Sequence, residues 1–103
     1  MTIVISIVKS DFGYYYAVSN DHALENISSE VIRLLREQRE RRKLSMNTLA
    51  ERSGLSQSMI SLVERGLRNP TLDTMLRIAE VLEVDLGKII TQARKTAGKR
   101  PME

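Results

Sequence analysis

Apolar residues recur at intervals of three or four along most of the chain, which is typical of amphipathic helices. The pattern is sharpest in Ser45–Gly66, where Ser45 and Ser56 are suitable N-caps and Gly54 stands between them at a turn. Two short helices are predicted here, at about 46–53 and 57–65. This is the form of a helix-turn-helix unit, and equally of any short αα-hairpin inside a helical bundle.

Three further helices are predicted around this unit. The first starts near Ser28 or Ser29, after a polar connector at Asn20–Asn26. Thr71 can cap a fourth helix and Asp85 a fifth, because their side-chain oxygens can accept a first-turn backbone N–H. The helical part of the chain therefore has five expected helices.

The N-terminal segment Met1–Ser19 follows a different pattern. Thr2–Val8 is β-branched except at Ser6, and Tyr14–Val18 is aromatic and aliphatic, with turn residues between them. This pattern predicts a β-hairpin. An isolated two-stranded hairpin is marginal in water, so it needs a partner. That partner is the helical domain or the same hairpin of a second subunit, unless the start of the chain is misassigned and the segment is frayed.

Composition excludes several classes of protein. The chain has no cysteine, and its single histidine, His22, lies in the polar connector, so no zinc site is expected. The longest apolar run, Ile3–Val8, is interrupted by Ser6 and is far too short to span a membrane. The sequence contains no arrangement typical of an enzyme, such as a nucleophile with a base or a Gly-rich phosphate loop. We therefore expect no catalysis, no cofactor and no metal, and the absence of cysteine fits a cytoplasmic location.

Charge is distributed unevenly along the chain. Residues 1–30 hold one Lys against four acidic residues, whereas the remainder holds 15 Lys and Arg against 9 Asp and Glu. A basic body suits a polyanionic partner, although an ordinary solvated surface would also explain it. From Thr91 onward, basic residues stand among small ones, and this tail is expected to be disordered.

Four ordered stretches resemble a known family. They read Leu-Ala-Glu-Arg-Ser-Gly-Leu-Ser at 49–56, Ile-Ser-Leu-Val-Glu-Arg-Gly at 60–66, Asn-Pro-Thr-Leu at 69–72 and Ile-Ala-Glu-Val-Leu-Glu-Val at 78–84. With these separations, the chain from about Val31 to Ile90 resembles the Cro-like phage-repressor family, also called the xenobiotic-response-element family. The resemblance implies a mainly α, five-helix repressor-like DNA-binding domain, here with an N-terminal β-hairpin extension. The expected division is 1–26 for the hairpin and linker, 27–93 for the DNA-binding domain with its helix-turn-helix at about 45–66, and 94–103 for the basic tail.

The resemblance also assigns roles to individual residues. The base-reading positions of the recognition helix would be Gln57, Ser58, Ser61 and Leu62, although burial against a neighbouring helix is the alternative for Leu62. DNA phosphates would be contacted by Asn47, Thr48, Arg65, Arg68 and Asn69. Arg39 would pair with Glu64 and link the first helix to the third. The sequence departs from the family pattern at Met46 and Thr48, where Gln and Glu are frequent, which puts one phosphate contact and the orientation of Gln57 in question.

The function expected from this resemblance is sequence-specific binding of double-stranded DNA by a transcriptional regulator. A repressor that acts as a homodimer on an inverted repeat is the leading hypothesis, because a single small DNA-binding domain buries little surface on DNA. Prophage repressors, restriction–modification controllers and antitoxins share this layout. The alternative is a protein-interaction adaptor or antitoxin-type partner that binds another protein through residues 1–19.

Overall fold

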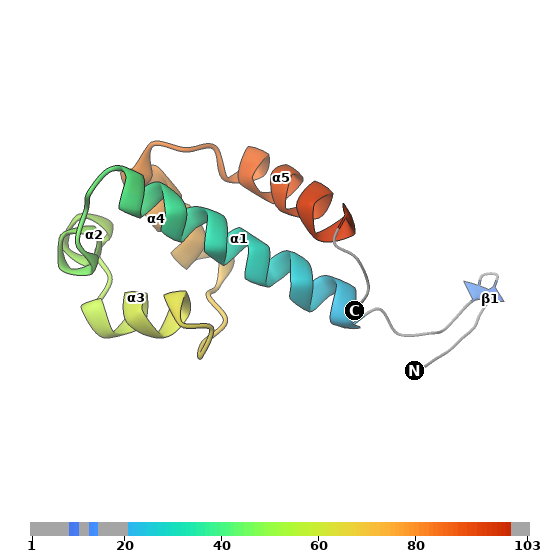
Figure 1. Ribbon diagram of the computed structural model, residues 1–103. Helices are drawn as coiled ribbons and strands as arrows, with labels where there is room; N and C mark the ends of the chain where they lie inside the picture. The colour runs from blue at the N-terminus through green and yellow to red at the C-terminus, as the bar shows by residue number, and fades with distance from the viewer. Residues whose placement is uncertain (1–8, 11–12, 15–20, 100–103) are drawn as a thin grey trace.

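The computed structural model describes residues 9–10, 13–14 and 21–99, and its helical part is a bundle of five helices (Figure 1). The helices are α1 (Asp21–Arg41), α2 (Met46–Ser53), α3 (Gln57–Glu64), α4 (Leu72–Leu82) and α5 (Leu86–Lys99). α1 and α5 lie side by side along much of their length, and α2 packs against both α3 and α4. The predicted mainly α, five-helix architecture is confirmed.

A side-chain oxygen caps the start of each helix from α2 to α5. The caps are Ser45, Ser56, Thr71 and Asp85, whose oxygens accept first-turn backbone N–H groups at 3.0, 3.0, 3.1 and 3.2 Å. Because the first N–H groups of a helix have no partner within it, such caps set where each helix begins. All four agree with the sequence prediction.

Two glycines turn the chain at the ends of α2 and α3. Gly54 has φ +77° and Gly66 has φ +75°, a left-handed conformation that glycine adopts without a Cβ clash. A Cβ at Gly54 would also lie 3.3 Å from Nη1 of Arg77, whereas one at Gly66 would meet nothing within 4 Å. Gly54 is therefore favoured for its positive φ, and a Cβ there would also displace the end of the Arg77 side chain of α4.

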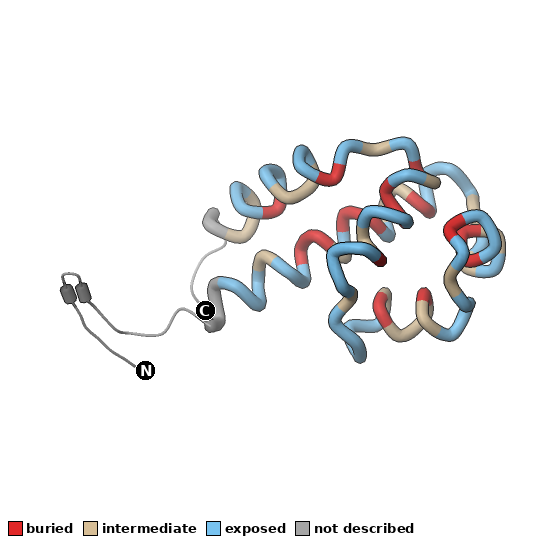
Figure 2. The backbone as a smooth tube through the Cα atoms, turned by 180° about the vertical axis from the view of Figure 1, so that it is seen from behind, coloured by how far each residue is buried: buried red, intermediate tan, exposed pale blue. Residues whose placement is uncertain are grey.

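The core lies where the five helices meet (Figure 2). Leu49, Ile60 and Leu82 are at most 1% exposed, and they come from α2, α3 and α4. Further buried apolar residues are Val31, Leu34, Leu35, Ala50, Val63, Ile78, Ala79, Leu86 and Ala93. Burial of these side chains stabilises the domain by about 25 cal/mol per Å² of apolar surface removed from water.

The predicted start of the first helix is wrong. α1 begins at Asp21, so the segment expected to be a polar connector belongs to the helix from that residue on, and His22 lies in it. Ile27 packs against the core, and α5 lies alongside α1. The extra turns of α1 therefore have a helix to pack against, which a local pattern of polar residues does not reveal.

The predicted disorder of the tail is also wrong as far as Lys99. α5 continues through Thr91 to Lys99, and Ala93 is fully buried in it. The hydroxyl of Thr91 donates to the carbonyl of Gly87 at 3.0 Å, as helical Thr side chains often do. Packing on α1 orders this segment although its composition is that of a solvated tail. Residues 100–103 lie outside the described part of the chain.

The predicted N-terminal hairpin is not supported. The described strands are β1 (Lys9–Ser10) and β2 (Gly13–Tyr14), each of two residues, and they pair in parallel with an irregular register. A hairpin needs antiparallel strands with a regular ladder. Most of the residues on which the prediction rested, at 1–8 and 15–19, lie outside the described part of the chain.

Candidate nucleic-acid interface

The outer side of α3 carries the four predicted base-reading residues. Gln57 and Ser58 are exposed, and Ser61 and Leu62 are partly exposed. They recur at helical spacing and so share one side of α3, whereas Ile60 and Val63 are buried on the other. Leu62 is therefore not fully buried, and part of its side chain remains available for apolar contact.

The start of α2 presents two of the predicted phosphate contacts. Asn47 is exposed and Thr48 is partly exposed. The Ser45 hydroxyl accepts from the backbone N–H of Thr48 at 3.0 Å and donates to Thr48 Oγ1 at 2.9 Å. Met46 is partly buried against the core, so the polar side chains of this first turn are those of Asn47 and Thr48.

The loop that follows α3 holds the other three predicted phosphate contacts. Arg65, Arg68 and Asn69 are all exposed. Within the described residues, neither arginine forms an ion pair. Gly66 reverses the chain between them, and the N–H of Leu67 donates to the carbonyl of Leu62 at 2.9 Å, which closes the end of the helix. The loop thus places two uncompensated cations beside the recognition helix.

Arg39 and Glu64 form a bidentate ion pair between α1 and the end of α3. Arg39 Nε and Nη2 donate to Glu64 Oε2 and Oε1 at 2.7 and 2.9 Å, and the two side chains are only 10% and 8% exposed. This geometry gives a strong charge-assisted contact. The hydrogen bond to Glu64 raises the pKa of Arg39 above its usual value, while burial opposes that rise. The pair has the partners that the family resemblance implied.

The sequence model of the helix-turn-helix family matches residues 35–89, which is more than half of the chain. The chain belongs to the helix-turn-helix family. Its predicted resemblance to the Cro-like branch of DNA-binding regulators is thereby confirmed, and the members it resembles are named as transcriptional regulators.

Two curated relatives illustrate the family match. An uncharacterized HTH-type transcriptional regulator of Mycobacterium tuberculosis is 46% identical over 59 residues, which cover 57% of this chain and 42% of that protein. A second, from Sinorhizobium fredii, is 36% identical over 70 residues, which cover 68% of this chain and 86% of that protein. The chain thus spans less than half the length of the mycobacterial relative and most of the length of the other.

A solved structure shares the fold of this helix-turn-helix protein. It is the crystal structure of a mutant of the restriction-modification controller protein C.Esp1396I, with a TM-score of 0.65 and 27% sequence identity. The superposition covers 73% of this chain and 97% of the controller. Nearly the whole controller therefore corresponds to about three quarters of this chain.

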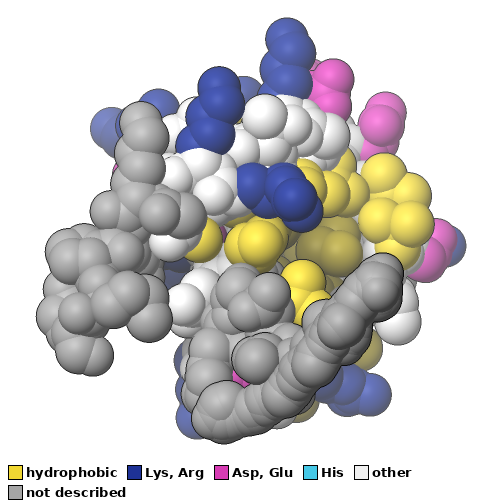
Figure 3. Space-filling model, turned by 90° about the vertical axis from the view of Figure 1, so that its right-hand side faces the viewer, with side chains coloured by type: hydrophobic (Ala, Val, Ile, Leu, Met, Phe, Trp, Pro, Cys, Tyr) yellow, Lys and Arg dark blue, Asp and Glu magenta, His cyan; other side chains and the backbone are white. Residues whose placement is uncertain are grey.

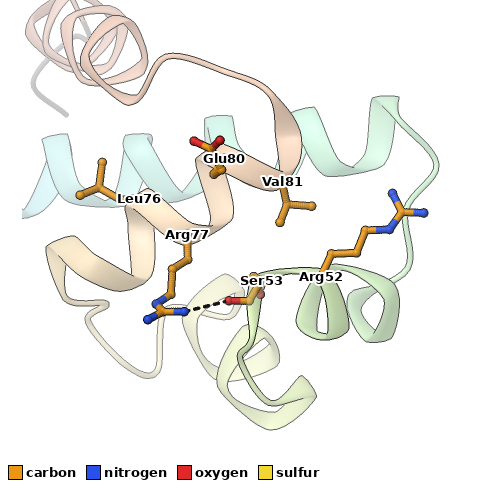
Figure 4. Close-up of a pocket in the computed structure, with 6 residues that line it drawn as sticks. All are labelled: Arg52, Ser53, Leu76, Arg77, Glu80 and Val81. Atoms are coloured by element: carbon orange, nitrogen blue, oxygen red, sulfur yellow. Dashed lines mark hydrogen bonds between the residues drawn. The ribbon is translucent and has the colours of Figure 1, made fainter.

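Two contacts that hold the helix-turn-helix in place were not predicted. Arg39 Nη1 donates to the carbonyl of Leu44 at 2.7 Å, and Arg77 Nη1 donates to the carbonyl of Ser53 at 3.4 Å (Figure 4). Both acceptors are backbone atoms, so no side-chain pattern in the sequence indicates them. The first contact holds the connection between α1 and α2, and the second holds the end of α2 against α4.

A shallow hollow of about 330 Å³ lies between α2 and α4 (Figure 4). Its lining residues are Arg52, Ser53, Leu76, Arg77, Glu80 and Val81. None of the predicted DNA-contacting residues is among them.

In the described ranges, no three His, Cys, Asp or Glu side chains gather closely enough to hold a metal ion. No helix among the described residues is long and apolar enough to cross a membrane.

Proposed function

We propose that this protein is a sequence-specific transcriptional repressor that binds double-stranded DNA through α3. The observation that carries the proposal is the outer side of α3, where Gln57 and Ser58 are exposed in a helix-turn-helix domain. An α-helix fits the major groove, whose floor presents a distinct hydrogen-bonding pattern for each base pair. A regulator of this kind would act in the cytoplasm of a prokaryotic cell, where its DNA target lies.

Gln57 is the residue best suited to select a base. It is the first residue of α3, and the N-terminal residues of a recognition helix point toward the base edges. A glutamine amide can pair with both N6 and N7 of adenine, which discriminates against other bases by about 1–3 kcal/mol. Ser58 and Ser61 can donate or accept and so specify weakly, and Leu62 suits a thymine methyl.

The phosphate contacts would place α3 in register with the groove. Arg65 and Arg68 follow the helix as exposed cations, and Asn69 adds an amide beside them. Asn47 and Thr48 lie at the start of α2, where backbone N–H groups also favour an anion. Contacts of this kind fix orientation and supply affinity without reading sequence.

The proposed active form is a homodimer on an inverted repeat. Heads related by a two-fold axis would reach half-sites about 34 Å apart on one side of the duplex. The described part of the chain has large apolar side chains at its surface, which association could cover. Figure 3 shows hydrophobic side chains gathered on one face of the molecule. The exposed large apolar residues are Leu24, Leu67, Leu72 and Leu76.

Selection of bound duplexes from random DNA at near-physiological salt tests this function. We expect enrichment of an inverted repeat by the wild-type chain and by Gln92→Ala, a variant at an exposed glutamine of α5. Gln57→Ala should enrich a repeat with one relaxed position in each half-site. Absence of any enriched sequence for the wild-type chain would overturn the proposal and favour a protein-interaction role for residues 1–19.

A further inference from the structure

Three consecutive cations lie at the end of α1 and in the connection that leads to α2. Arg41, Arg42 and Lys43, here called the α1–α2 corner, have exposed side chains. None of them forms an ion pair within the described residues. Arg42 donates from Nη1 to the neutral amide oxygen of Gln38 at 2.6 Å, which leaves its charge uncompensated. The corner therefore presents positive charge to an anionic partner.

The position of the corner is fixed relative to α3. Arg39 Nη1 donates to the carbonyl of Leu44, the residue that follows the corner, and the same guanidinium holds Glu64 at the end of α3. The backbone N–H of Leu44 in turn donates to the carbonyl of Arg39 at 3.2 Å. These bonds join the corner to the recognition helix through one buried side chain.

Helical periodicity separates the three cations into two groups. Residues three apart share a side of a helix, whereas residues two apart lie on opposite sides. Arg42 follows Arg39 by three and continues the helical bonding through its N–H to the carbonyl of Gln38. Arg42 therefore lies close to the side of the helix on which Arg39 meets α3, whereas Arg41 lies roughly opposite Arg39. Lys43 comes next, at a left-handed turn with φ +56° that leads into α2.

We propose that Arg42 and Lys43 form a third group of phosphate contacts, on the DNA backbone next to the start of α2. The inference rests on the proposed DNA-binding function and adds residues to that interface. Guanidinium and ammonium groups are the side chains that bind phosphate most strongly, and each phosphate neutralised releases condensed counterions. Arg41, on the other side of α1, makes no such contact.

The salt dependence of DNA affinity tests this inference. The dissociation constant for a fixed duplex is measured between about 50 and 200 mM salt for wild type, Arg42→Gln, Lys43→Gln and the matched control Arg41→Gln. Each of the first two variants should lower the slope of log affinity against log salt by about one, so its affinity should fall roughly fourfold less over this range. Arg41→Gln should keep the wild-type slope.

The outcomes separate this inference from the proposed function. Unchanged slopes for Arg42→Gln and Lys43→Gln, or an equal drop for Arg41→Gln, would overturn Arg42 and Lys43 as specific phosphate contacts while sequence-selective binding by the wild type stood. A drop confined to Arg42→Gln and Lys43→Gln supports these two residues as phosphate contacts even if the wild type binds all sequences alike, which would contradict only the proposed specificity. A wild-type chain that binds no DNA overturns both.

Discussion

At the scale of single residues, the Arg39 side chain links α1 to two other segments of the domain. Its guanidinium joins Glu64 at the end of α3 to the carbonyl of Leu44 before α2, and it is nearly buried. Its pKa is raised by Glu64, so the stabilisation that it contributes is present below the ordinary pKa of arginine. That contribution would be lost only as the pH rises through the raised value. The Arg39 guanidinium therefore stays charged at neutral pH.

Removal of one partner of this pair should be costly. Glu64→Ala leaves the Arg39 charge buried without its partner and should lower the free energy of unfolding by about 3–5 kcal/mol. Glu40→Ala is the control, because the pair of Glu40 with Arg36 is half-exposed and should contribute less than about 1 kcal/mol. Urea denaturation measures both values. Equal losses in the two variants would contradict a special role for the buried pair.

The division of labour between base and phosphate contacts is testable with two alanine variants. Gln57→Ala should relax base preference at one position of each half-site, because only that residue is expected to read that base. Arg68→Ala should weaken binding to all sequences alike and lower the salt slope by about one, because its partner is a phosphate. Competition binding with single-base operator variants measures the first effect. If both variants weakened all duplexes equally, Gln57 would not be a base-reading residue.

At the scale of elements, the two turn glycines provide a matched pair. Both have positive φ, but only Gly54 faces a close neighbour, with Arg77 Nη1 at 3.3 Å from an added Cβ. Gly66→Ala should cost about 1–2 kcal/mol of stability from the left-handed backbone alone. Gly54→Ala should cost more, because the Arg77 side chain must also move. Thermal unfolding of the two variants checks the order, and the reverse order would contradict the packing of α4 against the turn.

The extension of α5 is a second feature at this scale. Ala93 is fully buried, so Ala93→Glu should place an unpaired charge in the core and lower stability by about 2–5 kcal/mol. Its exposed neighbour serves as control, and Gln92→Glu should change stability by less than about 0.5 kcal/mol. Chemical denaturation compares them. A neutral effect of Ala93→Glu would mean that this segment is as loosely held as its composition suggests.

At the scale of the whole molecule, the proposed dimer makes a geometric prediction. Two heads joined by a two-fold axis bind half-sites on the same side of the duplex, so about five extra base pairs between half-sites would place them on opposite sides. We expect this insertion to reduce affinity toward that of a single half-site. Gel-shift titration of the two duplexes measures it, with a point change in one half-site as control. Equal affinity for both spacings would indicate independent monomers.

The sequence alone determined the helix starts from α2 to α5, the turn at Gly54 and the resemblance to the family. The helix starts and the turn depend on chemistry within about four residues, such as a cap or a positive φ, and the resemblance depends on the order and spacing of such local stretches. The tertiary structure decided the rest. The first turns of α1 and the last turns of α5 are helical because each packs against the other, although their composition suggests a connector and a tail. The bonds from Arg39 to Leu44 and from Arg77 to Ser53 end on backbone carbonyls, which a sequence pattern does not mark and which only the packed helices bring within reach.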